Sequence, residues 1–163
     1  MRLLAGPRQT GQALVEFSLV ILIFVVLLTA LFDFGRGILA YNDVSNAARE
    51  GGRTAIVNQY QPDIVARAVA QALTLGVSTS ATCTGGAVAA ASPSGVCASF
   101  VYPDMTTDCS STLAPGCVAI VRVKYTYTPL TPLIGNIIGP IALNATTQQT
   151  IESVCAASGC PVP

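Results

Sequence analysis

The sequence predicts an α+β protein with a single membrane span. A long N-terminal helix is expected to cross the bilayer, continue outside it and pack on a small antiparallel sheet that disulfides staple together. Three observations predict this fold. Residues 13–32 form an apolar run of about 20 residues, the length a helix needs to span a membrane. Residues 117–129 and 141–153 alternate between apolar and polar side chains, and all six cysteines follow the apolar run.

Composition narrows the classes of function. Of 163 residues, 10% are charged and 52% are hydrophobic, which is too apolar for an ordinary soluble domain. The formal net charge of zero argues against a nucleic-acid partner. Histidine is absent, so no Ser/His or Cys/His catalytic pair can form, and no glycine-rich phosphate loop follows a strand. We therefore expect no enzymatic activity, no catalytic residue, no cofactor and no metal.

The orientation of the span follows from its flanks. Glu16 is the only charge in residues 13–32. The arm before the span carries Arg2 and Arg8 and no acid, whereas the charges after it are mixed in sign. The positive-inside bias keeps the N-terminus in the cytoplasm and exports the rest of the chain.

A cleaved secretory signal is the alternative for this apolar run. Such signals have an apolar region of about 7–15 residues and small residues at −3 and −1 of the cut. Here the run is longer, and a cut after Ala30 would place Leu28 at −3. The sequence favours a retained span.

Glu16 needs a physical explanation, because a carboxylate at mid-bilayer costs about 3 kcal/mol. It lies one turn into the helix, so it could reach the interface by snorkelling, or it could face a partner. The flanking residues favour a partner. Gly11 precedes Gln12, Glu16 is the fifth residue counted from Gln12, and Phe17 follows it.

The order of these residues resembles the type IV prepilin signal: a glycine, four residues, a glutamate, an aromatic residue and then a hydrophobic helix. In that signal a dedicated membrane peptidase cuts after the glycine. The wider block, residues 11–53, is similar to the TadE-like family, the minor pilins or pseudopilins of the tight-adherence (Tad/Flp) pilus system. The specific parts of the match are "GQALVEF", "FDFGR" and "NAAREGGR".

The resemblance implies how the N-terminus works. It implies cleavage between Gly11 and Gln12 by a prepilin peptidase, and subunit docking through Glu16 and Phe17. In pilin-like assemblies the corresponding glutamate pairs with the terminal amine of a neighbouring subunit. Two opposite charges about 4 Å apart gain about 4 kcal/mol at an effective dielectric constant of 20, which offsets much of the desolvation of Glu16.

The helix signal continues beyond the span. From residue 33 to about residue 57 there is no proline, and apolar residues recur at helical spacings. Small residues within it would let another backbone approach closely. These small residues are Ala47, Ala48, Gly51, Gly52 and Ala55. We favour packing on this protein's own sheet, with a sister subunit as the alternative. Arg36, Arg49, Glu50 and Arg53 are expected to form a solvated face.

Shorter elements follow. "NQYQPDIVARAVAQALTLG" predicts a second helix, with Pro62 in its first turn and Gly76 as its stop. Within residues 77–116 only "CASFVY" indicates a strand, and the rest is predicted as loop.

Residues 117–129 and 141–153 predict neighbouring antiparallel strands whose apolar face the long helix covers. The linker between them, "PLTPLIGNIIGP", is expected to form a lid over the sheet edge, with a partner or membrane-surface contact as the alternative.

Six cysteines confined to the exported part predict disulfides in an oxidising compartment. They are Cys83, Cys97, Cys109, Cys117, Cys155 and Cys160. Six cysteines permit 15 connectivities, and the sequence does not select one. We favour closure of each successive pair, because a predicted loop lies between its members. Zinc is disfavoured, since the chain has no C-x-x-C pair and no histidine.

Together these features divide the chain into a cytoplasmic leader (1–11), a transmembrane helix (12–32), its extension (33–60) and an exported pilin-like α+β domain (61–163).

The resemblance implies a minor pilin or pseudopilin that acts in pilus assembly, initiation or capping, and adhesion. It would sit in the bacterial cytoplasmic membrane, with its C-terminal domain periplasmic or extracellular, or enter the pilus. Its partners would be the bilayer, other pilin and pseudopilin subunits, the prepilin peptidase and the assembly platform. The alternatives are a permanently anchored periplasmic binding or scaffold subunit of the Tad secretion apparatus and, more distantly, an anchored enzyme.

Overall fold

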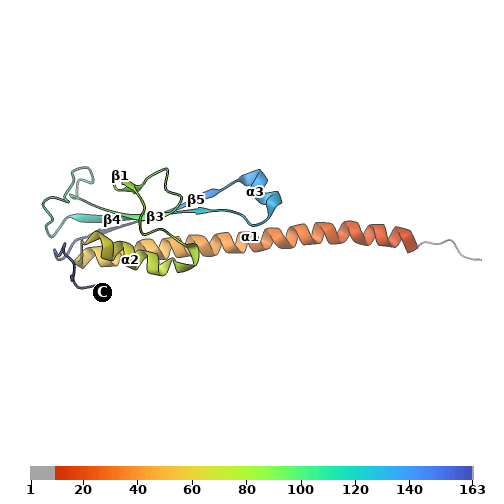
Figure 1. The fold of residues 1–163 in the computed structure, drawn as a ribbon, viewed down its shortest axis with the longest axis horizontal. Coiled ribbons are helices and arrows are strands. Elements are labelled where there is room, and N and C mark those ends of the chain that lie inside the picture. The colour runs from red at the N-terminus through yellow and green to blue at the C-terminus, as the bar shows by residue number, and fades with distance from the viewer. Residues whose placement is uncertain (1–9, 163) are drawn as a thin grey trace, which may run out of the picture.

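One long helix organises the molecule. A computed structural model describes residues 10–162, in which helix α1 runs from Thr10 to Val57 (48 residues). Its N-terminal part extends alone, and its C-terminal part lies against the sheet and a second helix (Figure 1). The predicted continuous helix to about residue 57 is confirmed. Arg2 and Arg8, which the orientation prediction uses, lie outside the described residues.

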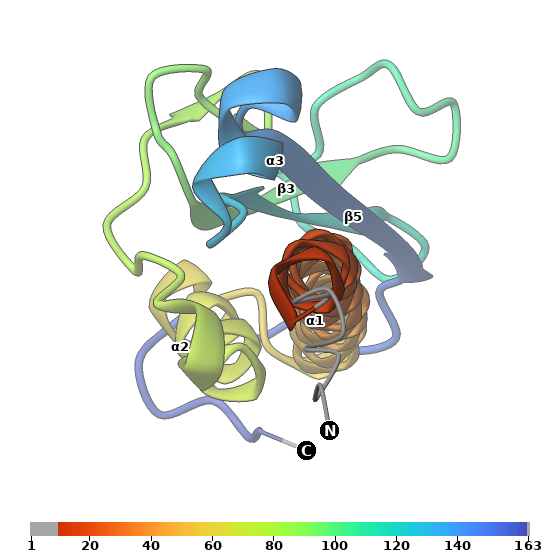
Figure 2. The same cartoon turned by 90° about the vertical axis from the view of Figure 1, so that its right-hand side faces the viewer.

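A three-stranded antiparallel sheet covers the second half of α1. Its strands are β3 (Gly95–Val101), β4 (Val118–Tyr127) and β5 (Ile141–Thr150), in the order β3-β4-β5. At the centre, Val121 of β4 faces Ala98 on one side and Thr147 on the other. Helix α1 packs against β4 and β5 on one face of the sheet, and α2 packs against β3 (Figure 2).

The alternation predicted for the central strand decides which face of the sheet is buried. Ala119, Val121 and Val123 point into the core and are at most 1% exposed. Arg122 points to the opposite face, where its guanidinium donates a hydrogen bond of 2.8 Å to the carbonyl oxygen of Gly86. The period of two in the sequence therefore sorts the two faces of the sheet.

The second helix, α2 (Gln61–Gln71), follows α1 after a short turn, and Pro62 lies in its first turn as predicted. Its buried residues are Ile64 and Ala68. A single 3-10 turn, η1 (Leu73–Leu75), extends it, and Gly76 ends the turn in the left-handed region (φ 61°). That backbone conformation favours glycine, so the predicted stop is confirmed.

Two predictions about loops were wrong. Residues 77–116 contain, besides β3, a hairpin of β1 (Cys83–Thr84) and β2 (Ala87–Val88). Its two turn glycines both have positive φ (56° and 74°), and strands of two residues are too short to show alternation.

The linker between β4 and β5 forms the short helix α3 (Pro132–Ile138) at the end of the sheet instead of a lid over its edge (Figure 1). The reason is topological. Antiparallel neighbours are joined where their strands end, not along an outer edge.

The small residues of α1 contact the protein's own domain, which is the packing we favoured. Ala47, Ala48 and Ala55 are at most 1% exposed. A Cβ added to Gly51 would lie 2.9 Å from Val121 Cγ1, and one added to Gly52 would collide with Thr147 Cγ2. Glycine at these positions lets the helix backbone lie directly on the sheet.

Three disulfides close successive pairs of cysteines, with Cα–Cα distances of 5.9, 6.5 and 5.7 Å. They are Cys83–Cys97, Cys109–Cys117 and Cys155–Cys160. The first ties the β1–β2 hairpin to β3, the second closes the connection between β3 and β4, and the third closes the C-terminal tail. This is the local pairing that we favoured from the loops between the cysteines.

Candidate functional site

The N-terminal part of α1 is exposed and apolar. Every residue from 11 to 28 is exposed. By length and composition, α1 is the one helix among residues 10–162 that could cross a membrane. Its mean hydropathy reaches 2.8 in one window of the helix, and no residue of that window is buried. A membrane-spanning role explains why so much apolar surface has no protein against it.

The predicted cleavage position lies in the first turn of this helix. Gly11 is exposed, and a Cβ added there would meet nothing within 4 Å. The helix start is therefore open to another protein, which is what a peptidase site needs.

Glu16 differs from the other polar side chains in the apolar part of α1. Ser18 donates its hydroxyl to the carbonyl oxygen of Val15 (2.8 Å), and Thr29 donates to backbone carbonyls of the preceding turn at 3.0 Å. These groups are satisfied by their own helix. Within residues 10–162 no cation forms an ion pair with Glu16.

Phe17 lies next to Glu16 and is 66% exposed. The rise of an α-helix places Gly11 and Phe17 about 9 Å apart along the axis. The structure thus brings the predicted cleavage and docking residues, Gly11, Gln12, Glu16 and Phe17, onto two turns at one end of the molecule.

At the other end of the apolar segment, Asp33 fastens the β4–β5 connection to α1. Its carboxylate accepts hydrogen bonds from the N–H of Leu130 (3.1 Å), the N–H of Thr131 (3.0 Å) and the hydroxyl of Thr131. Arg36 Nη1 lies 3.8 Å from Asp33 Oδ1. Asp33 is only 6% exposed, so a buried charge is balanced by three donors and a cation.

These donors shift the acidity of Asp33. The hydrogen bonds from the Thr131 side chain and backbone hold the pKa of the Asp33 carboxyl below its ordinary value, against the opposing effect of burial. The N–H of Leu130 and the charge of Arg36 lower the pKa further. The carboxyl is therefore ionised at neutral pH even though it is buried.

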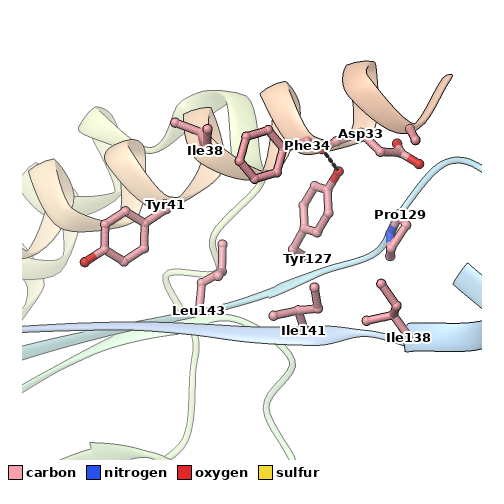
Figure 3. A pocket seen from close by; sticks show the side chains of 11 residues that line it. Asp33, Phe34, Ile38, Tyr41, Tyr127, Pro129, Ile138, Ile141 and Leu143 are labelled. Atoms are coloured by element: carbon pink, nitrogen blue, oxygen red, sulfur yellow. Dashed lines mark hydrogen bonds between the residues drawn. The ribbon is translucent and has the colours of Figure 1, made fainter. Parts of the chain in front are cut away.

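Tyr127 makes a second attachment at the same level. Its hydroxyl donates to the backbone carbonyl oxygen of Asp33 at 2.9 Å (Figure 3). Burial, and secondly the negative charge of Asp33, raise the pKa of Tyr127. We define Asp33, Tyr127 and Thr131 as the boundary latch, because together they hold the end of the sheet to α1 just after its apolar segment.

An apolar groove of about 440 Å³ lies beside the latch, between α1 and the ends of β4 and β5. Phe34, Ile38 and Tyr41 line this groove from α1, and Ile141 and Leu143 line it from β5 (Figure 3). Its lining is almost entirely hydrocarbon, so it suits acyl chains or apolar side chains rather than a polar substrate.

A more polar hollow of about 580 Å³ lies on the opposite face of the sheet. Its charged groups are already engaged. Arg122 bonds to the backbone of Gly86 and Asp108 accepts from the N–H of Ser110 (2.7 Å), a bond that lowers the pKa of Asp108. Asp104, on the same loop, accepts from the N–H groups of Thr106 and Thr107 as a turn residue. These contacts account for the polar groups structurally.

The boundary latch was missed in the sequence. In the sequence, Asp33 is one of the mixed charges after the span and Tyr127 is one member of an alternating strand, and neither pattern predicts a contact between them. A usable signal is present: "FDFGR" places an acid between two phenylalanines at the end of the apolar segment of the helix. The partner Thr131, however, is 98 residues away along the chain.

Comparison with known proteins finds a family similarity within the N-terminal helix. A family model described as TadE-like protein matches residues 11–53. The matched segment lies wholly within α1 and includes Gly11, Gln12, Glu16, Phe17 and Asp33. No curated protein and no solved structure matches the chain. The match agrees with the resemblance seen in the sequence and suggests a component associated with a Tad pilus.

Proposed function

We propose, with the TadE-like match of residues 11–53 as the premise, that the protein is a minor pilin or pseudopilin of a tight-adherence pilus. It acts by assembly, in initiation or capping of the pilus and in adhesion. The observation that carries the proposal is Glu16: on an exposed apolar helix, at the fifth position after Gly11, this carboxylate has no ion-pair partner within residues 10–162.

Membrane placement is the first step of the proposal. Residues 12–32 span the bacterial cytoplasmic membrane, residues 1–11 remain in the cytoplasm as a leader, and residues 33–60 carry the helix outward. The domain of residues 61–163 is then periplasmic or extracellular. The length and exposure of the apolar part of α1 support the span, and the three disulfides support an oxidising compartment for the domain.

Processing is the second step. A prepilin peptidase cuts between Gly11 and Gln12 and leaves an ammonium group on Gln12. The exposure of this first turn supports access by an enzyme.

Docking is the third step. The new ammonium of one subunit pairs with Glu16 of its neighbour, and Phe17 packs beside the pair. A pair about 4 Å apart at an effective dielectric constant of 20 contributes about 4 kcal/mol, enough to select one register between neighbouring helices. Other pilin or pseudopilin subunits and the assembly platform are the partners.

Two measurements test these steps. The intact mass of the purified protein is expected to correspond to a chain that begins at Gln12. A chain that begins at Met1 would instead support a permanently anchored scaffold subunit of the secretion apparatus.

The docking test replaces the charge at Glu16. Glu16→Gln should insert into the membrane and be cleaved like the wild type but fail to co-purify with pilus assemblies, because the ammonium loses its counter-charge. Ser18→Ala is the matched control, since the Ser18 hydroxyl bonds only its own helix. Normal incorporation of Glu16→Gln would contradict the pairing.

A further inference from the structure

We infer that the β4–β5 connection, residues 128–140 with α3, docks on the surface of the same bilayer that α1 crosses. The protein then touches the membrane twice, once through its span and once through this turn. The occupant of the apolar surface is lipid of the leaflet on the exported side. The inference rests on the membrane placement of α1 in the proposed function.

The boundary latch fixes the position of this turn along α1, relative to the end of the proposed span. Leu130 and Thr131 are bonded to Asp33, the first residue after the proposed span of residues 12–32. Tyr127 is bonded to the backbone of the same residue. Because one residue of α1 receives all of these bonds, the turn is held level with the point where the helix leaves the hydrocarbon. Figure 1 shows α3 at the end of the sheet nearest the bare part of α1.

The surface at this height is apolar and exposed. Leu130 and Ile137 are each 76% exposed, and Ile138 is 61% exposed. No charged residue occurs between Lys124 and Glu152. Branched aliphatic side chains in water are costly, whereas the boundary of a bilayer accepts them without desolvating a charge.

The charges nearby fit a lipid surface as well. The carboxylate of Asp33 is turned to backbone donors, so it presents no free anion to the headgroups. The side chain of Arg36 is 52% exposed beside it and can reach a lipid phosphate. The apolar groove, with Phe34 and Ile38 on one wall, joins α3 to the exposed helix without a polar break.

Continuity favours lipid over a second copy of the chain. The exposed apolar surface of α1 continues through Leu31 and Phe32 and reaches the latch, and α3 lies at the same level at the end of the neighbouring sheet (Figure 1). A bilayer that covers the first surface reaches the second without any further association. A second copy would have to approach through the layer of headgroups.

The chain offers a clean reporter, because it contains no tryptophan. Single tryptophans are introduced into the full chain at Ile137, Leu130, Leu22 and Val154, all exposed in the structure. The variants are reconstituted in phosphatidylcholine vesicles with bromine atoms either near the headgroup or deep in the acyl chains. Val154 is the matched apolar control. It follows Ser153, whose N–H bonds Ile56, about 35 Å along α1 from Asp33.

Ile137→Trp and Leu130→Trp are expected to lose fluorescence, most strongly with the shallow bromines, and to shift their emission to the blue. Leu22→Trp should be quenched most by the deep bromines, and Val154→Trp should not be quenched.

Three outcomes would overturn the inference. If Leu22→Trp is quenched but both turn reporters are not, the turn does not touch lipid although the span stands. A blue shift that depends on protein concentration, without quenching, would assign α3 to a second copy. If Leu22→Trp is itself not quenched, the membrane placement fails and the proposed function fails with it.

Discussion

Two acidic residues of α1, Asp33 and Glu16, differ in whether the chain itself balances their charge. Asp33 accepts hydrogen bonds from Leu130 and Thr131 and faces Arg36, so its charge is balanced within the chain. Glu16 has no cation as a partner among the described residues. A carboxylate whose charge is balanced within the fold contributes to stability. A carboxylate that would lie unpaired in the bilayer favours binding of a cationic group from another molecule. This difference places Asp33 in the architecture and supports the proposed docking role of Glu16.

The pH dependence of the boundary latch follows from the lowered pKa of Asp33. Its ordinary value is 3.8, and hydrogen bonding by Thr131 lowers it in the folded protein. Below pH 3.8 the unfolded chain therefore binds the proton more readily than the folded one, so stability rises with pH in this window. The contribution of Asp33 is complete above the unfolded pKa and is lost as pH falls through the folded value.

NMR can check this prediction in detergent micelles. The amide resonances of Leu130 and Thr131 should titrate with a midpoint below 3.8, and Asp33→Asn should abolish this titration. The variant is needed because hydrogen bonds also lower the pKa values of Asp104 and Asp108. Unchanged amide titrations in Asp33→Asn would mean that Asp33 does not hold the turn.

At the level of elements, α1 changes its surface along its length. Its first part carries large apolar side chains that are exposed; Leu22 is 66% exposed and Phe24 is 56% exposed. Its last part carries small side chains that are buried; Ala47 and Ala55 are each 0% exposed. Large side chains maximise contact with lipid, whereas small ones let the helix backbone approach the sheet. One helix can thus serve as membrane anchor and as the central element of the domain.

Gly52→Ala tests the close approach of α1 to β5. Alanine favours a helix over glycine by about 1 kcal/mol, but the added Cβ collides with Thr147 Cγ2, and overpacking costs about 1–3 kcal/mol. We expect a net loss of about 1 kcal/mol in the free energy of unfolding. Denaturant unfolding in micelles, followed by tyrosine fluorescence, measures it.

Two controls accompany this substitution. Gly35→Ala makes the same change on the same helix where nothing lies within 4 Å, and it should stabilise or leave stability unchanged. Adding Thr147→Ala to Gly52→Ala removes the colliding methyl group and should restore most of the loss. If Gly52→Ala proves as stable as Gly35→Ala, the helix and sheet are not in close contact there.

At the scale of the whole molecule, disulfides support a small core. The buried cluster consists largely of alanine, valine and cysteine, which bury little area per residue. The segments between β2 and β3, between β3 and β4 and after β5 have little regular structure. Cross-links that restrict the unfolded chain compensate for this modest core.

The first and third disulfides should differ in effect. Cys83→Ala with Cys97→Ala opens a separation of 14 residues and is expected to lower the free energy of unfolding by about 3 kcal/mol. Cys155→Ala with Cys160→Ala opens a separation of only 5 and should cost about 2 kcal/mol. Denaturant unfolding of each variant against the wild type measures both. Equal stability of wild type and the first variant would show that this bridge leaves the unfolded ensemble unrestricted.

Local patterns were enough to predict most elements. The helices α1 and α2, the strands β3 to β5 and the side of α1 that meets the sheet all follow from spacings of 3.6 or 2 residues. The pairing of successive cysteines followed from short loops between them. The hairpin of β1 and β2 was missed, because two residues cannot show a period.

Of the candidate site, the sequence supplied Gly11, Gln12, Glu16 and Phe17, since their pattern is confined to seven consecutive residues. It could not supply the boundary latch. Asp33, Tyr127 and Thr131 meet only because β4 runs back along α1 and ends beside residue 33.

The sequence by itself thus determined the long apolar helix, the α+β class and the charge at Glu16, because each depends on neighbours within a few turns or strands of the chain. Tertiary structure alone decided that α3 lies level with the end of the apolar segment and that α1 buries its glycines on its own sheet. Those facts depend on contacts between residues about 95 positions apart, such as Tyr127 with Asp33, and no local periodicity encodes such contacts.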